Sequence, residues 1–128
     1  MTEKTWKATL DYFGLEGQVA IVTGAGNGIG EATATMLANL GAKVAVCDIE
    51  IARAERVAQN ITNCGGTAIA VACDVGSQEQ IERAVEEVAA QLGSIDILVN
   101  NAAGFGGGKT LDQVDLKEWD RLIHLNLT

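Results

Sequence analysis

The sequence has 128 residues, 48% of them hydrophobic, and this length predicts a single globular domain. Seventeen acidic residues against nine basic ones give a net charge of −8, which disfavours binding to nucleic acid. No apolar run approaches the roughly 18 residues of a membrane-spanning helix, and the charged N-terminal stretch MTEKTWKATLDYFG does not fit an export signal.

The three cysteines, Cys47, Cys64 and Cys73, form neither an even set for disulfides nor the spaced pairs of a zinc site. We therefore expect no bound metal and a reducing, cytoplasmic setting. Cys47 and Cys73 end apolar runs, and we expect both to be small buried residues.

Four short apolar runs rich in Val and Ile alternate with amphipathic stretches. The runs cover 19–23, 43–47, 67–73 and 95–100, and they are almost continuously apolar, which is typical of strands buried on both faces of a parallel sheet. Strands and helices alternate and a helix follows the last strand. This order predicts an α/β fold with a Rossmann-type open parallel sheet in a three-layer αβα arrangement.

The amphipathic stretches predict four helices. The first ends at Gly41 and carries on one face Ile29, Thr33, Met36, Leu37 and Leu40. The second covers about 51–63, with inward-facing Val57, Ala58 and Ile61. The third begins with a capping box of Ser77 and Gln80, ends at Gly93, and is expected to bury Ile81, Ala84, Val85, Val88 and Leu92. The fourth begins at Asp115, where Glu118 completes a second capping box, and has at helical spacing Trp119, Leu122, Ile123 and Asn126.

The stretch TGAGNGIG at 23–30 follows the first strand directly and opens the first helix. A dinucleotide diphosphate needs bare backbone amides and the positive end of a helix. Gly24 allows a sharp turn off the strand, Gly28 removes a Cβ that would block the diphosphate, and Gly30 lets helix and sheet pack closely. We interpret the stretch as a phosphate-binding turn rather than a turn that is glycine-rich by chance.

Asp48 ends the second strand, 24 residues after Gly24. A carboxylate there can accept hydrogen bonds from the ribose hydroxyls of a dinucleotide and would repel a 2′-phosphate. Positions 27 and 49 are Asn and Ile, so no basic residue is expected near that phosphate, and NAD(H) is favoured over NADP(H). The alternative is a solvated aspartate that caps the next helix.

Five segments resemble, in order and spacing, the classical short-chain dehydrogenase/reductases from Leu15 onward: TGAGNGIG (23–30), Asp48, CDV (73–75), LVNNAA (98–103) and LNL (125–127). The resemblance implies an N-terminal extension at 1–14 and a partial NAD(P)-binding domain at 15–128, with strand order 3-2-1-4 and truncation before a fifth strand. It implies an NAD-dependent oxidoreductase that transfers hydride between a nicotinamide and a small-molecule alcohol or ketone.

The resemblance also assigns roles. The cofactor site would comprise Gly24, Asn27, Gly28, Ile29, Gly30, Asp48, Ile49, Asp74, Val75, Asn101, Ala102 and Ala103. Asp74, with the backbone of Val75, would meet the adenine ring, unless it is only a strand-to-helix cap. Asn101 and Ala102 would pass beside the ribose, with Ala103 where the family has glycine.

Asn126 would hold a water in a proton relay to a catalytic lysine, unless it is merely a polar residue on a mostly buried helix face. His124 is expected to form a helix-surface pair with Asp120. We expect Trp6 and Trp119 to be core or docking residues rather than residues that stack on a cofactor. We expect the Gly-rich segment 104–110 to be a binding loop.

The family chemistry also needs a Ser and a Tyr-x-x-x-Lys motif. The one tyrosine here is Tyr12, and Glu16 stands four residues later, so we expect these 128 residues to turn over no substrate by themselves. The strand at 95–100 would form an open sheet edge, which predicts self-association into a homo-oligomer or dependence on a missing C-terminal segment. A non-catalytic dinucleotide-binding or interaction module is the alternative, and a methyltransferase with Asp48 on the ribose of S-adenosylmethionine is disfavoured.

Overall fold

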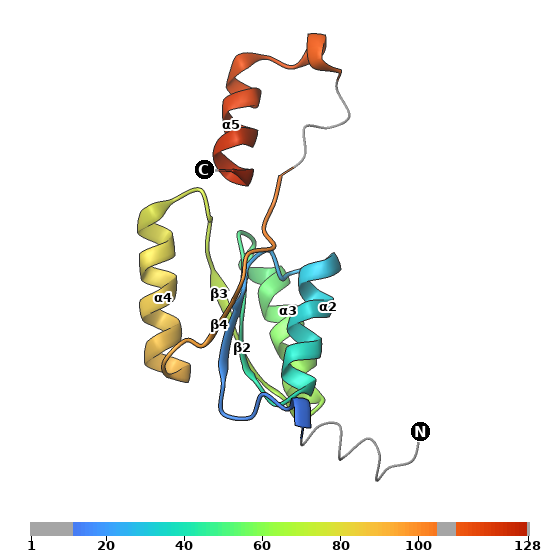
Figure 1. Ribbon diagram of the computed structural model, residues 1–128, viewed down its shortest axis with the longest axis vertical. Coiled ribbons are helices and arrows are strands. Elements are labelled where there is room, and N and C mark those ends of the chain that lie inside the picture. The colour runs from blue at the N-terminus through green and yellow to red at the C-terminus, as the bar shows by residue number, and fades with distance from the viewer. Residues whose placement is uncertain (1–11, 105–109, 128) are drawn as a thin grey trace.

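The structure, a computed structural model, describes residues 12–104 and 110–127 (Figure 1). Its elements are β1 (Val19–Val22), α2 (Gly28–Asn39), β2 (Lys43–Asp48), α3 (Ile51–Asn63), β3 (Thr67–Ala72), α4 (Gln78–Leu92), β4 (Ile97–Val99), a 3₁₀ turn η1 (Leu111–Gln113) and α5 (Leu116–Asn126). All four predicted strands and all four predicted helices are present. Trp6 and most of the predicted Gly-rich loop lie outside the described residues.

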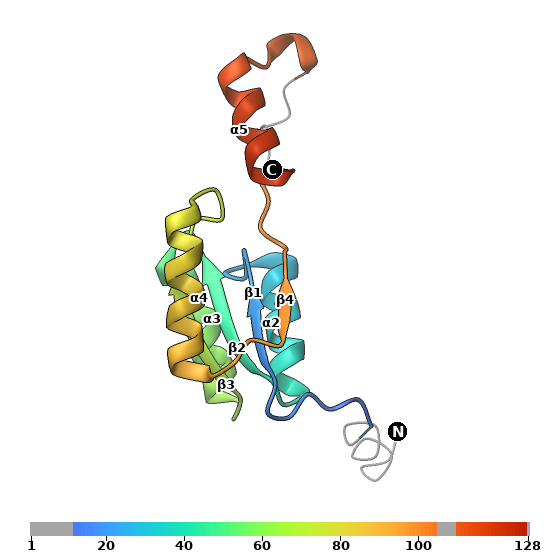
Figure 2. The same ribbon diagram turned by 60° about the vertical axis from the view of Figure 1, so that its left-hand side comes forward.

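The four strands form one parallel sheet in the order β3-β2-β1-β4, as predicted. Ile21 of β1 lies opposite Ala45 of β2 on one side and Leu98 of β4 on the other. Helices α2 and α3 cover one face of the sheet and α4 lies on the other (Figures 1 and 2). Because all strands run the same way, their carboxyl ends meet at a single edge.

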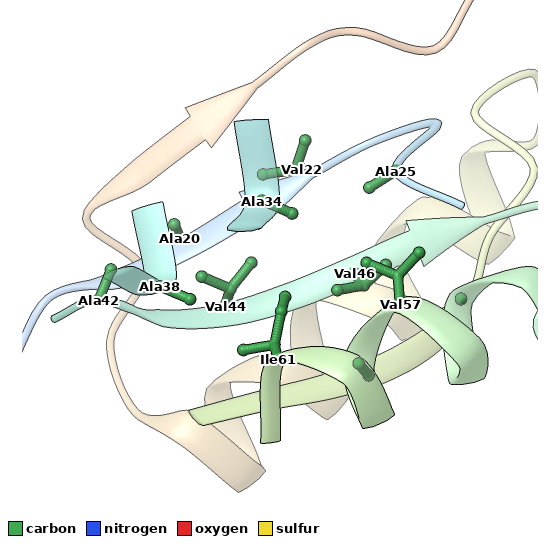
Figure 3. Packing of buried hydrophobic residues seen from close by; sticks show 12 residues of the cluster. Ala20, Val22, Ala25, Ala34, Ala38, Ala42, Val44, Val46, Val57 and Ile61 are labelled. Atoms are coloured by element: carbon green, nitrogen blue, oxygen red, sulfur yellow. The ribbon is translucent and has the colours of Figure 1, made fainter. Parts of the chain in front are cut away.

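The larger core lies between the sheet and helices α2 and α3 (Figure 3). The strands contribute alternate residues to it: Ala20, Val22, Val44 and Val46. From α3, Val57 and Ile61 pack onto β2, and the predicted inward face of this helix is confirmed. The second core, on the α4 side of the sheet, contains Cys47 of β2 and Cys73, which follows β3; both cysteines are buried, as expected.

The apolar face predicted for the first helix is only in part the face that packs on the sheet. The residues of α2 that pack on the sheet are Gly30, Ala34 and Ala38, whereas Ile29 and Met36 are 80% and 60% exposed. Side chains no larger than a methyl group let α2 lie close against β1, where Ala34 and Ala38 point at Val22 and Val44 (Figure 3). Leu37 still packs against this core and is partly buried, whereas Ile29 and Met36 are turned away from it.

Helix α4 also buries less than predicted. Ala84 and Val88 are buried, but Ile81 and Val85 remain about 40% exposed. The Ser77 hydroxyl accepts a hydrogen bond from the Gln80 amide, as a capping box requires. The reciprocal bond is absent because the Ser77 amide donates to the Asp74 carbonyl.

Helix α5 stands beyond the carboxyl edge of the sheet (Figures 1 and 2). It begins as predicted, with Asp115 Oδ1 accepting from the Glu118 amide at 2.7 Å. None of its described residues is buried, and Trp119 is 47% exposed, so this tryptophan is not a core residue. Among the described residues, no helix combines the length and apolar character needed to cross a bilayer.

Candidate functional site

A pocket of about 490 Å³ lies at the carboxyl edge of the sheet. Eleven of the twelve residues predicted for the cofactor site line it, from all four strand ends: Gly24, Asn27, Gly28, Ile29, Asp48, Ile49, Asp74, Val75, Asn101, Ala102 and Ala103. Gly30 lies buried behind them. The pocket has three further lining residues that the sequence did not indicate: Arg53, Cys73 and Leu125.

The three glycines of the turn after β1 are required for three different reasons. Gly24 has φ +60°, and a Cβ there would lie 2.9 Å from the Ala102 Cα. Gly28 has φ +55° and no atom within 4 Å of its Cβ position, so only open pocket lies beside it. A Cβ at Gly30 would overlap the Gly24 carbonyl oxygen and lie 2.6 Å from Asn101 Nδ2. Only at Gly28 is the missing side chain replaced by space that a ligand could fill.

The N-terminal end of α2 faces this space. Asn27 is its N-cap residue, yet its side chain makes no capping hydrogen bond. The first-turn amides of a helix have no acceptor within the helix, and here no N-cap side chain supplies one. They carry the partial positive charge that favours an anion.

Thr23 connects the turn after β1 with the segment after β4. Its hydroxyl accepts from the amides of Asn101 and Ala102, both at 3.0 Å, and donates to the Val99 carbonyl at 3.3 Å. The Asn101 side chain donates to the carbonyls of Thr23 and Gly24. Sequence reasoning missed Thr23; a hydroxyl residue between a buried strand and a glycine turn was the available signal.

Asp48 is only 6% exposed, and both its carboxylate oxygens accept backbone hydrogen bonds. Oδ2 accepts from the Gly26 amide at 2.9 Å, and Oδ1 accepts from the Glu50 amide at 3.0 Å. A Cβ at Gly26 would lie 2.6 Å from Asp48 Oδ2. Asp48 therefore ties the glycine turn to the start of α3 while it lines the pocket.

Arg53 corrects the expectation that no basic residue lies near the end of β2. It lines the pocket from the first turn of α3, with Nε 3.0 Å from Glu50 Oε2. The position of Arg53 five residues after Asp48 could have indicated that it lies near the pocket, because the first turn of a helix that follows a strand lies at the carboxyl edge of the sheet.

Asp74 both caps a turn and lines the pocket. Its Oδ1 accepts from the Gly76 amide at 2.9 Å, and its own amide donates to Gln80 Oε1. The two interpretations of Asp74 are therefore compatible.

Asn126 lies outside this pocket. Its Oδ1 accepts from the Gly104 amide at 3.1 Å, and its Nδ2 donates to the carbonyls of Gly104 and Leu122. The side chain is exposed, which corrects the alternative that placed it on a mostly buried helix face. Asn126 lines a second pocket of about 450 Å³ on the α4 side of the sheet.

His124 does not form the expected pair with Asp120. Its Nε2 lies 3.0 Å from the Gly76 carbonyl, and the described residues contain no ion pair between His124 and Asp120. This contact fastens α5 to the loop before α4, which explains how Leu125, the next residue, comes to line the first pocket.

Cys73 lines this pocket and Cys47 lines the second one, and burial disfavours the thiolate form of both. Burial raises the pKa of the Cys47 thiol to about 12, with smaller contributions from Cys73 and nearby carboxylates. Burial, followed by the charge of Asp74, also raises the pKa of the Cys73 thiol. Because the thiolate is the reactive form, Cys73 provides an apolar wall of the pocket.

Comparison with known proteins shows the family of this chain. Residues 18–128 match the family model described as short chain dehydrogenase. The chain is 40% identical over 117 residues to the 7alpha-hydroxysteroid dehydrogenase of Escherichia coli (strain K12), covering 91% of this chain and 45% of that protein.

Solved structures agree. A 7 alpha-hydroxysteroid dehydrogenase complexed with NADH and 7-oxo glycochenodeoxycholic acid matches with a TM-score of 0.85 at 40% identity, covering 91% of this chain and 45% of that one. A metagenomic short-chain oxidoreductase in complex with NADP matches with a TM-score of 0.82 at 41% identity, covering 88% and 51%. The chain spans about half the length of these proteins, and it belongs to the short-chain dehydrogenase family.

Proposed function

We propose that this chain binds NAD(H) in the pocket at the carboxyl edge of the sheet. It would form the cofactor-binding portion of an oxidoreductase that acts on an alcohol or ketone. The observation that carries the proposal is the convergence of eleven of the predicted residues, from four strand ends, on one pocket. Relatives that bind NADH or NADP support a nicotinamide cofactor.

The residues present fit a dinucleotide. Gly28 leaves open space beside the N-terminal end of α2, where a diphosphate would accept hydrogen bonds from backbone amides. Asp48 would hold the ribose, Asp74 and Val75 would lie at the adenine, and Asn101 to Ala103 would line the second ribose. When bound, the nicotinamide would donate or accept hydride; the protein contributes binding and orientation.

Asp48 favours NAD(H) in this proposal. Its buried carboxylate would repel a 2′-phosphate. Arg53 lies nearby, but its guanidinium is paired with Glu50, so its charge is compensated. NADP(H) should therefore bind more weakly.

The 128 residues by themselves are proposed not to catalyse turnover. Tyr12, the one tyrosine of the sequence, is 84% exposed and has Glu16 four residues later. The proton-relay role of Asn126 stays part of the proposal, and its hydrogen bonds to Gly104 would have to exchange for a water. Oxidation of an alcohol with NAD⁺ by the purified chain would contradict this part.

Fluorescence titration of the folded chain with NADH and NADPH tests the cofactor. We expect saturable NADH binding that is at least tenfold tighter than NADPH binding. Asp48→Asn, which keeps one acceptor oxygen, should weaken NADH binding and reduce the difference in affinity between NADH and NADPH. Asp120→Asn, on exposed α5, should change neither the NADH affinity nor this difference. A folded chain that binds neither dinucleotide would refute the proposal.

A further inference from the structure

Arg56 of α3 reaches across to the glycine turn, although it does not line the pocket. Its Nη2 donates to the Gly26 carbonyl at 2.9 Å and to Glu31 Oε2 at 2.9 Å, and its Nη1 donates to Glu31 Oε1 at 3.0 Å. One side chain thus joins α3, the turn after β1 and the first turn of α2. The planar guanidinium matches this geometry because its donors form a rigid fork.

Gly26 is held on both sides. Its amide donates to Asp48 Oδ2, and its carbonyl accepts from Arg56. In a planar trans peptide the carbonyl of one residue and the amide of the next point in opposite directions. The bond from Arg56 to the Gly26 carbonyl therefore also sets the direction of the Asn27 amide, in a residue that lines the pocket.

Arg56 also compensates a charge. Glu31 lies in the first turn of α2, where its carboxylate is favourable for the helix but unfavourable for a bound anion. The guanidinium of Arg56 lowers the pKa of this carboxyl, so Glu31 is ionised and paired at neutral pH. An unpaired Glu31 would repel a diphosphate at the same helix end.

We propose that Arg56 is a positioning residue of the dinucleotide site, which orients the glycine turn through the Gly26 carbonyl and neutralises Glu31 at the end of α2 that receives the diphosphate. The inference rests on the proposed function. It assigns a role in binding to a residue whose side chain is half exposed and outside the pocket.

Titration with NADH separates the two effects of Arg56. Arg56→Met should weaken NADH binding about tenfold, the effect of losing one charge-assisted hydrogen bond. Glu31→Gln combined with Arg56→Met removes the repulsion but not the loss of orientation, so NADH binding should recover only in part. Adenosine, which lacks the diphosphate, should bind equally to all variants. Arg83→Met, on α4 at the opposite face of the sheet, is the matched control and should bind NADH normally.

Amide hydrogen exchange measured by NMR gives a readout that needs no ligand. Exchange at the Gly26 amide, which donates to Asp48 Oδ2, should accelerate in Arg56→Met and stay unchanged in Arg83→Met. If Arg56→Met does not fold, Arg56→Lys keeps the charge without the fork and should show a smaller change in the same direction.

Unchanged exchange at the Gly26 amide, or full recovery of NADH binding in the double variant, would overturn the role in positioning. Failure of the unmodified chain to bind NADH would instead count against the proposed function, and the exchange experiment would still test the orientation of the turn.

Discussion

Gly28→Ala is the substitution that most directly tests the glycine turn as a phosphate site. Gly28 has φ +55°, and a methyl group there meets no protein atom within 4 Å. The left-handed backbone costs an alanine about 1–2 kcal/mol, and the lower entropy of the unfolded chain offsets part of that cost, leaving a destabilisation of about 1 kcal/mol. The thermal midpoint should therefore fall by about 5 °C.

The effect on binding should be much larger. The new methyl group would occupy the open space beside the first amides of α2 and keep a diphosphate out of hydrogen-bonding range. Loss of even one charge-assisted hydrogen bond costs about 1.5–3 kcal/mol, so NADH should bind at least about tenfold more weakly. Thermal unfolding by circular dichroism and NADH fluorescence titration measure the two effects separately.

Gly65→Ala is the matched control. Gly65 follows α3, has φ +90° and also has no atom within 4 Å of its Cβ position, so alanine meets at least as large a backbone penalty away from the pocket. Its thermal midpoint should fall at least as much while NADH binding stays normal. Wild-type NADH affinity in Gly28→Ala, or equal loss of affinity in both variants, would refute the reasoning.

Three further predictions concern the core, a thiol and the sheet edge. Ala34→Leu overpacks α2 against the sheet and should lower the free energy of unfolding, measured in urea, by about 2 kcal/mol. Met36 is 60% exposed, so Met36→Ser should change this free energy by less than about 0.5 kcal/mol. Equal effects of the two substitutions would contradict the observed packing face of α2. Burial raises the pKa of the Cys47 thiol from 9.0 to about 12, so iodoacetamide at pH 8 should modify exposed Cys64 and should not modify Cys47 until the chain unfolds. The contribution of the protonated Cys47 thiol to the free energy of unfolding should be complete below pH 9 and should be lost as the pH rises towards 12. Leu98 is 58% exposed on β4, the edge strand of the sheet. We expect the unmodified chain to self-associate in sedimentation experiments, and Leu98→Lys should reduce this self-association. If the unmodified chain sediments as a monomer at high concentration, it does not form an oligomer through this edge.

The sequence by itself determined the order of the elements, the parallel sheet and most of the pocket. Continuous Val- and Ile-rich runs indicate strands buried on both faces, and such strands connected by helices adopt few arrangements. Residues that follow strand ends then meet at one edge. This is why Gly28 and Asp48, interpreted from their spacing, line one pocket with Asp74 and Asn101, which the family resemblance assigned. The physical cause is local: each of these residues is located by the strand that precedes it.

Tertiary structure decided what depends on contact between elements. The sequence pattern predicts an apolar face of α2 that includes Ile29 and Met36, but both are exposed in the structure. The closeness of β1 places Gly30, Ala34 and Ala38 against the sheet instead. The hydrogen-bond partners of Thr23 described above lie 76 to 79 residues away in the sequence, and those of Arg56 lie 25 to 30 residues away. No periodicity in the sequence indicates such pairs. Hydrogen bonds and close packing depend on distances of a few ångströms across the fold, and only the assembled sheet and helices set those distances.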